Sequence, residues 1–147
     1  IGAPYWNPMA TGGIFGITRG TKKGHIARAA LEAIAIRSME IIEEMQKDSG
    51  IQFSVLRADG GASMNNLLMQ IQANLLDTKV VRPKTTETTA LGIAFLAGLA
   101  CGFWENKEAI RDLWVLDKEF HPQQSEKNNK MLLLWRKHMA QTLKNGS

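Results

Sequence analysis

The sequence is poor in the features that mark secreted and membrane proteins. Cys101 is the only cysteine among 147 residues, so no disulfide can form within the chain, and a reducing, cytoplasmic location is expected. The longest apolar run, residues 90–104, is shorter than the ~20 residues that span a bilayer, and Glu87 and Glu105 bracket it. The run therefore predicts a buried helix and no membrane span. The chain has no signal-peptide pattern and opens at Ile1 rather than at methionine, so a fragment is expected.

The sequence also lacks a concentration of charge of one sign. Its formal net charge of +4 arises from 18 Lys and Arg against 14 Asp and Glu. Proteins that bind nucleic acids usually gather basic residues on one face, whereas the basic residues of positions 127–144 fit a solvated helix face. We expect no nucleic-acid partner. His25 has no second histidine or carboxylate pair at ligand spacing, so a structural role is expected and no metal site is predicted.

Strand-like and helical patterns alternate along the chain. Short apolar or alternating stretches predict strands at residues 12–18, 53–59 and 79–83. Longer amphipathic or apolar stretches predict helices at residues 22–48, 63–76, 88–103, 106–113 and 125–143. Gly50 should end the first of these helices, and Ser63 should cap the second. Because helical crossovers separate the central strands, the pattern predicts an α/β fold with a mixed sheet flanked by helices.

The predicted helix at residues 88–103 has a stripe of small side chains. The stripe consists of Ala90, Ala94, Ala97 and Cys101. Small residues allow a neighbouring backbone to approach closely, so we expect this helix to be buried and tightly packed. The four tryptophans are likewise interpreted as core or interface anchors rather than as groups that stack on a ligand; they are Trp6, Trp104, Trp114 and Trp135.

The stretch LRADGGASMNN, residues 56–66, places two glycines between a predicted strand and a predicted helix. Glycine lets a phosphate or sugar approach the backbone, and a helix N-terminus offers free N–H groups. Asn65 lies four residues after Gly61, where its amide could reach a base or ribose edge. A plain tight turn is the alternative interpretation of Gly60 and Gly61. The stretch matches neither GxxxxGK[ST] nor GxGxxG, so it is neither a P-loop nor a Rossmann fingerprint.

Three separated stretches, in the same order, resemble the carboxyl-terminal part of the FGGY family of sugar kinases. They are residues 2–35, residues 56–76 and residues 87–104, the last reading ETTALGIAFLAGLACGFW. A family signature fits residues 12–32 through Gly12, Ile14, Gly16, Ile17, His25, Ile26, Ala29, Ala30, Leu31 and Glu32. The resemblance implies that residues 1–147 are a C-terminal nucleotide-binding portion of an actin-like ATPase (ribonuclease H-like) domain.

The resemblance also implies an activity and a binding site. The residues of these motifs are most similar to those of the family members that transfer the γ-phosphate of ATP to glycerol, with Mg²⁺ bridging the phosphates. By position, Gly61 and Asn65 would bind ATP, with Asp59, Gly60 and Ala62 shaping the same turn. No catalytic residue is assigned in this chain, because the family's general base and its glycerol contacts lie in sequence outside it.

Three consequences and two alternatives accompany this interpretation. The isolated chain should be inactive, its partners should be ATP and, through the missing portion, glycerol, and a homo-oligomer is expected. A kinase for another sugar or polyol of the same family is one alternative. A non-catalytic, actin-like fragment that only binds nucleotide is the other.

Overall fold

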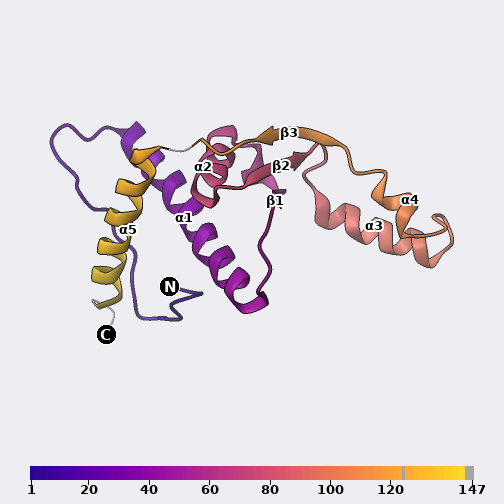
Figure 1. The fold of residues 1–147 in the computed structure, drawn as a ribbon, viewed down its shortest axis with the longest axis horizontal. Helices are drawn as coiled ribbons and strands as arrows, with labels where there is room; N and C mark the ends of the chain where they lie inside the picture. The colour runs from indigo at the N-terminus through magenta and orange to yellow at the C-terminus, as the bar shows by residue number, and fades with distance from the viewer. Residues whose placement is uncertain (124, 145–147) are drawn as a thin grey trace.

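The computed structural model of the chain describes residues 1–123 and 125–144, which form a small sheet with helices on either side of it along the molecule (Figure 1). In chain order the elements are α1 (Lys23–Ser49), β1 (Val55–Arg57), the 3₁₀ helix η1 (Gly61–Met64), α2 (Asn66–Leu76), β2 (Lys79–Pro83), α3 (Thr88–Ala100), α4 (Lys107–Arg111), β3 (Leu116–Phe120) and α5 (Glu126–Lys144). Each predicted helix is present, and its ends differ from the prediction by at most three residues.

The long helix α1 begins and ends as its sequence predicts. The backbone N–H of Lys22 donates to Nδ1 of His25 at 3.3 Å, so the imidazole satisfies a peptide group at the start of the helix. At the other end Gly50 adopts a left-handed φ of 69°, and its N–H donates to the carbonyl of Gln46 at 2.9 Å. This conformation favours glycine and terminates the helix. The structural role expected of His25 is therefore confirmed.

The sheet is mixed, as predicted, and its strand order is β1-β2-β3. The β1 strand pairs in parallel with β2, with Leu56 opposite Val80. The β3 strand runs antiparallel to β2, with Phe120 opposite Val80 on its other side. The helix α2 supplies the crossover between the two parallel strands, as a parallel connection requires.

The core lies where α1 and α2 pack on the sheet. Its buried members are Ala35 from α1, Leu68, Met69, Ile71 and Ala73 from α2, Val80 from β2 and Phe120 from β3. The central strand β2 is the most enclosed, and Val80 is fully buried. Leu56 and Ala58 pack against this core, so the carboxyl end of β1 and the turn that follows it adjoin the core.

The strand predicted at residues 12–18 is wrong for this structure. The segment has no strand assignment and is exposed throughout. A β-strand forms only beside another strand, and in the described part of the chain no strand pairs with this segment. Gly16 adopts a φ of 76°, which departs from extended backbone in the middle of the segment.

The expected burial of the helix at residues 88–103 is also wrong for this structure. The helix α3 extends from the sheet, with α4 near its far end, away from α1 and α5 (Figure 1). Of its small-residue stripe, Ala90, Ala94 and Ala97 are exposed, as is Cys101 just beyond its end. No other described element covers this face, so the close packing that the stripe predicts does not occur within residues 1–123 and 125–144. None of the described helices is long and apolar enough to cross a membrane.

The tryptophans lie in different surroundings. Trp104 packs edge-on against Phe95 and Phe103 in the arm that α3 and α4 form. Trp135 joins α5 to α1 by a hydrogen bond described below. Trp6 is 77% exposed, so of its two expected places the core is wrong for this structure, and the interface stays a prediction.

Candidate functional site

The turn after β1 is the site that the sequence predicts, and its backbone is fixed by Gly60. This glycine has a φ of 76°, in the left-handed region that side chains disfavour. Its N–H donates to the carbonyl of Thr86 at 2.9 Å, which ties the turn to the loop after β2. Ser63 is buried and stabilises the turn, because its hydroxyl donates to the carbonyl of Gly60 at 2.7 Å.

At Gly61, neither the backbone conformation nor the packing of this chain requires glycine. It is exposed, and a Cβ built on it would meet no described atom within 4 Å. By contrast, a Cβ on Gly98 would lie 2.1 Å from the ring of Trp104. The bare backbone at Gly61 and the neighbouring Ala62 therefore faces open space at the carboxyl end of a strand, where ligands of α/β sheets commonly bind.

Asn65 is the N-cap of α2. Its Oδ1 accepts the N–H groups of Leu67 and Leu68 at 3.0 and 3.1 Å. The prediction that Ser63 caps this helix is wrong, because η1 intervenes and buries Ser63 beneath the turn. With Oδ1 committed to the cap, the Nδ2 amide of Asn65 makes no hydrogen bond within residues 1–123 and 125–144. Asn65 can thus donate to a ligand without giving up the cap.

Arg82 supports the turn from the sheet, and sequence reasoning did not identify it. Its guanidinium is nearly buried, donates to the carbonyl of Ser63 at 2.8 Å and to Oδ1 of Asn66 at 3.0 Å, and pairs with Asp117 of β3 at 2.6 Å. One cation therefore links η1, the start of α2 and two strands. The available signal was an arginine within an apolar strand, which is buried only when it is paired.

The turn is also linked to the start of α3. The hydroxyl of Thr88, the first residue of α3, donates to the carboxylate of Asp59. Together with the bond from Gly60 to Thr86, this contact places the beginning of α3 directly beside the glycine turn. Asp59 is the acid nearest the turn in sequence, and its carboxylate is engaged by a hydroxyl rather than by a cation.

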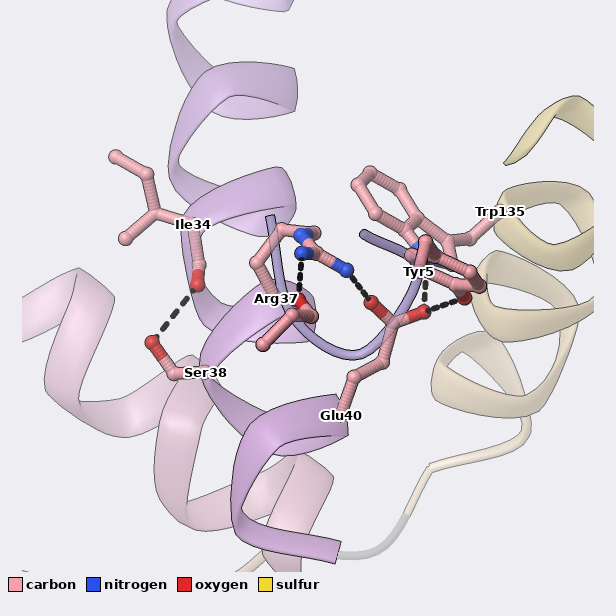
Figure 2. A network of polar contacts seen from close by, with 7 residues as sticks. Tyr5, Ile34, Arg37, Ser38, Glu40 and Trp135 are labelled. Atoms are coloured by element: carbon pink, nitrogen blue, oxygen red, sulfur yellow. Dashed lines mark hydrogen bonds and ion pairs between the residues drawn. The ribbon is translucent and has the colours of Figure 1, made fainter. Parts of the chain in front are cut away.

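A second polar cluster lies elsewhere, around Glu40 of α1 (Figure 2). Its Oε1 accepts the Tyr5 hydroxyl and the Trp135 indole N–H, each at 2.8 Å. Arg37 pairs with the same carboxylate and donates to the carbonyl of Ala3. Burial, followed by the hydrogen bond to Glu40 and its negative charge, raises the pKa of Tyr5 to about 12. The cluster fastens the first residues of the chain and α5 to α1.

The structure thus brings Gly60, Gly61, Ala62 and Asn65 together on one turn, as the sequence suggests. It adds Arg82 and Thr86 as residues that hold the turn. Among the described residues, no three histidine, cysteine, aspartate or glutamate side chains group as a metal site. What the turn offers chemically is therefore backbone N–H groups at the start of a helix, beside an Asp59 carboxylate that already accepts a hydroxyl.

Sequence comparison identifies similar proteins. The C-terminal domain of the FGGY family of carbohydrate kinases matches residues 1–101. A glycerol kinase of Deinococcus radiodurans is 56% identical over 141 residues, which are 95% of this chain and 28% of that protein. A glycerol kinase of the archaeon Saccharolobus islandicus is 54% identical over 90% of this chain and 26% of that protein. The chain spans little more than a quarter of the length of the curated relatives it matches.

Solved structures agree in fold. A crystal structure of Plasmodium falciparum glycerol kinase with ADP superposes with a TM-score of 0.83 at 37% identity, covering 96% of this chain and 28% of that one. A ligand-bound xylulose kinase from Lactobacillus acidophilus gives 0.76 at 26% identity, covering 99% and 30%. These neighbours confirm the predicted class, a part of the actin-like ATPase fold with a mixed sheet flanked by helices.

Proposed function

The chain belongs to the FGGY family of carbohydrate kinases, and from this premise we propose that residues 1–147 form the C-terminal nucleotide-binding portion of an ATP-dependent glycerol kinase. The reaction moves the γ-phosphoryl group of ATP to a hydroxyl of glycerol: a new phosphorus–oxygen bond forms and the bond to ADP breaks. The observation that carries the proposal is the open glycine turn at the end of β1, in a chain 56% identical to a glycerol kinase.

In this proposal the turn of Gly60 to Ala62 receives the nucleoside end of ATP. Gly61 leaves room for the nucleotide to contact the backbone, and Gly60 sets the direction of the turn. The Nδ2 amide of Asn65 donates to an acceptor on the base or ribose, because its Oδ1 is already used by the cap. The neighbour solved with ADP supports a nucleotide as the ligand of this fold.

The remaining parts of the reaction belong to the portion of the kinase outside this chain. Magnesium prefers oxygen ligands and is commonly held by one or two carboxylates together with substrate phosphates, and the described residues form no acidic cluster that would hold it alone. The general base and the glycerol contacts are likewise placed outside residues 1–147. We accordingly propose that the isolated chain does not turn over glycerol, and that the whole kinase is a cytoplasmic homo-oligomer.

A kinase for a different sugar is the second candidate. Gluconate and xylulose kinases share the fold at 25% and 26% identity. Glycerol is favoured because the curated glycerol kinases match at 52–56% identity over nearly the whole chain. A non-catalytic nucleotide-binding fragment would lack turnover even when the missing portion is supplied.

The decisive test separates the two roles of Asn65 in a full-length kinase that carries this chain. Asn65→Ser keeps an N-cap oxygen but removes the amide donors, whereas Asn65→Ala removes both. We expect both variants to weaken ATP binding about five- to tenfold, the loss of roughly 1 kcal/mol for one hydrogen bond. Only the alanine variant should also lower the thermal stability. Glycerol affinity should be nearly unchanged in both variants.

Gly61 provides an independent arm of the same test. A Cβ fits at this position in the chain itself, so Gly61→Val should fold normally while filling the space proposed for the nucleotide. We expect a larger increase in the Michaelis constant for ATP than Asn65→Ser produces. Equal losses for ATP and glycerol, or an unchanged constant for ATP in Gly61→Val, would remove these residues from the site.

A further inference from the structure

Arg82 is the only buried charged residue in the described part of the chain, residues 1–123 and 125–144. It lies in β2, with 6% of its surface exposed. Because β1 and β2 are parallel, with Arg57 opposite Val81, Arg82 lies at the edge of the sheet where β1 ends and the glycine turn begins. A buried cation is costly unless its donors are paired. The fold therefore keeps a desolvated, fully charged group beside the turn.

The guanidinium of Arg82 divides its donors between two sides. Its Nε donates to Oδ2 of Asp117 at 2.8 Å, and its Nη2 lies 2.6 Å from the same oxygen. Its Nη1 donates to the carbonyl of Ser63 at 2.8 Å and to Oδ1 of Asn66 at 3.0 Å. The ion pair with Asp117 thus fixes the orientation of the planar fork, and the remaining nitrogen binds the turn.

The two acceptors of Nη1 lie on either side of Asn65 in the chain. Ser63 precedes Asn65 by two residues, and Asn66 follows it directly. The hydroxyl of Ser63 also donates to the carbonyl of Gly60, so the restraint extends to the glycines. The segment between them is a 3₁₀ helix of four residues, whose own hydrogen bonds have poor geometry. One nitrogen of Arg82 therefore restrains the backbone from Gly60 to Asn66.

We propose that Arg82 is a positioning residue for ATP, which holds residues 60–66 in their binding geometry before the nucleotide arrives. The inference rests on the function proposed for the turn and adds the side chain that preorganises it. Arg82 acts through Ser63 and Asn66 and not by contact with ATP, because its donors are engaged within the chain. Without this restraint, ATP would have to order the turn as it binds, and that ordering lowers the affinity.

Arg82→Lys in a full-length kinase that carries this chain tests the geometry of the fork rather than the charge. Lysine keeps the positive charge and can pair with Asp117, but a single ammonium does not reproduce the fork that also reaches Ser63 and Asn66. We expect the Michaelis constant for ATP to rise about three- to tenfold, the cost of ordering one side chain on binding. The turnover number and the Michaelis constant for glycerol should change less than about twofold, because only nucleotide binding is weakened.

Met39→Ala is the control for lost stability. Met39 is 4% exposed and belongs to α1 rather than to the turn. We expect this variant to lower the melting temperature at least as much as Arg82→Lys does, because it leaves a cavity in a buried region. Its Michaelis constant for ATP should equal that of the unmodified kinase. A rise in that constant in Met39→Ala would mean that lost stability alone weakens ATP binding, and would overturn the proposal.

A double-mutant cycle with Asn65→Ser tests the route of the effect. If Arg82 acts by holding Asn65, then Arg82→Lys should raise the Michaelis constant by a smaller factor once the amide donors of Asn65 are gone. Asn66→Ala removes one acceptor of Nη1 from an exposed residue. It should raise the Michaelis constant for ATP by a smaller factor than Arg82→Lys does, and it provides the same test if the lysine variant does not fold.

Three results would overturn the proposal: an unchanged Michaelis constant for ATP in Arg82→Lys, equal losses for ATP and glycerol, or factors for Arg82→Lys and Asn65→Ser that multiply fully. If Asn65→Ser weakens ATP binding while Arg82→Lys and Asn66→Ala do not, the nucleotide site stands and only this inference fails. If Asn65→Ser and Gly61→Val both leave ATP binding unchanged, the proposed function fails and this inference fails with it.

Discussion

Helices α2 and α3 each follow a strand of the same sheet, yet their surroundings are opposite. Five of the 11 residues of α2 are buried, including Leu68 and Ile71. In α3, which has 13 residues, Gly98 is the only buried one among those described. The less apolar helix is the packed one, since α2 contains two glutamines and two asparagines whereas α3 has no charged or amide side chain.

The difference shows what hydrophobicity can and cannot predict. An apolar sequence predicts that a helix must be covered, because exposing Ile93 or Leu96 to water loses the transfer free energy of a buried side chain. It does not identify the covering element. For α2 that element is the sheet and α1 within this chain. For α3 no described element does so, and its exposed face stays in solvent in the described part of the chain.

The same leucine-to-alanine substitution in each of the two helices tests this difference most directly. Leu68 of α2 is 4% exposed and Leu96 of α3 is 70% exposed. We expect Leu68→Ala to destabilise the chain by about 3 kcal/mol through lost burial and a cavity. Leu96→Ala should change stability by less than about 0.5 kcal/mol. Urea denaturation monitored by circular dichroism measures both.

Under the proposed function, the same pair should behave differently in a longer protein that carries this chain. In a full-length kinase, covering of α3 would make Leu96→Ala destabilising as well. Equal costs for both leucines in the 147-residue chain would mean that α3 is already packed in solution, by this chain or by a second copy, and would contradict the exposed arm.

The second-largest effect is expected at Arg82, beneath the glycine turn. Arg82→Met keeps much of the side-chain length but leaves the carbonyl of Ser63 and the amide of Asn66 without this partner. Unsatisfied buried groups cost about 1–3 kcal/mol, and we expect a loss of about 2 kcal/mol. Asp117→Asn is the matched control, because Asp117 is 38% exposed and should cost clearly less. Equal losses would place the stabilisation in the ion pair instead.

Much of the fold follows from local sequence signals. Gly50 ends α1, and the short apolar run before Pro83 forms the central strand. Two predictions failed for one physical reason: a strand at residues 12–18 and burial of α3 both need a covering partner, and local sequence patterns do not specify one. The periodicity of a sequence shows which side chains must be covered, but it does not identify the element that covers them.

The candidate site is predictable in position but not in detail. The glycine pair between a strand and a helix identifies the turn, and the structure places Gly60 at a positive φ as such a turn requires. The cap was assigned to Ser63 rather than Asn65 because a 3₁₀ helix of four residues has no strong sequence signal. Arg82 was missed because its partners come from η1, α2 and β3, which only tertiary packing brings together.

A smaller effect, confined to the arm, is expected at Gly98. A Cβ there would lie 2.1 and 2.2 Å from ring atoms of Trp104. Gly98→Ala must therefore displace the indole and disrupt its edge-on contacts with Phe95 and Phe103. We expect a local cost of about 1 kcal/mol, seen as a shift of tryptophan fluorescence, with unfolding of α1 and α2 unchanged. Gly92→Ala, which meets open space on the same helix, is the control.

The smallest effect is expected at Tyr5, where the first residues of the chain meet α1 and α5. Tyr5 is the only tyrosine, so the absorbance of tyrosinate reports this one group. Its pKa is raised from 10.0 to about 12, first by burial and then by Glu40. In denaturant it should titrate near its ordinary value.

The sign of the linked stability follows from these two values. Between pH 10 and 12 the unfolded chain has lost the phenolic proton while the folded chain retains it, so the free energy of unfolding must fall as the pH rises. The contribution of Tyr5 is fully present below pH 10 and is lost as the pH passes 12. Because the side chain is partly exposed, solvent screening keeps the loss small. Tyr5→Phe should flatten the stability curve in this interval only, and titration of the folded chain near pH 10 would mean that the Glu40 cluster does not hold Tyr5 in solution.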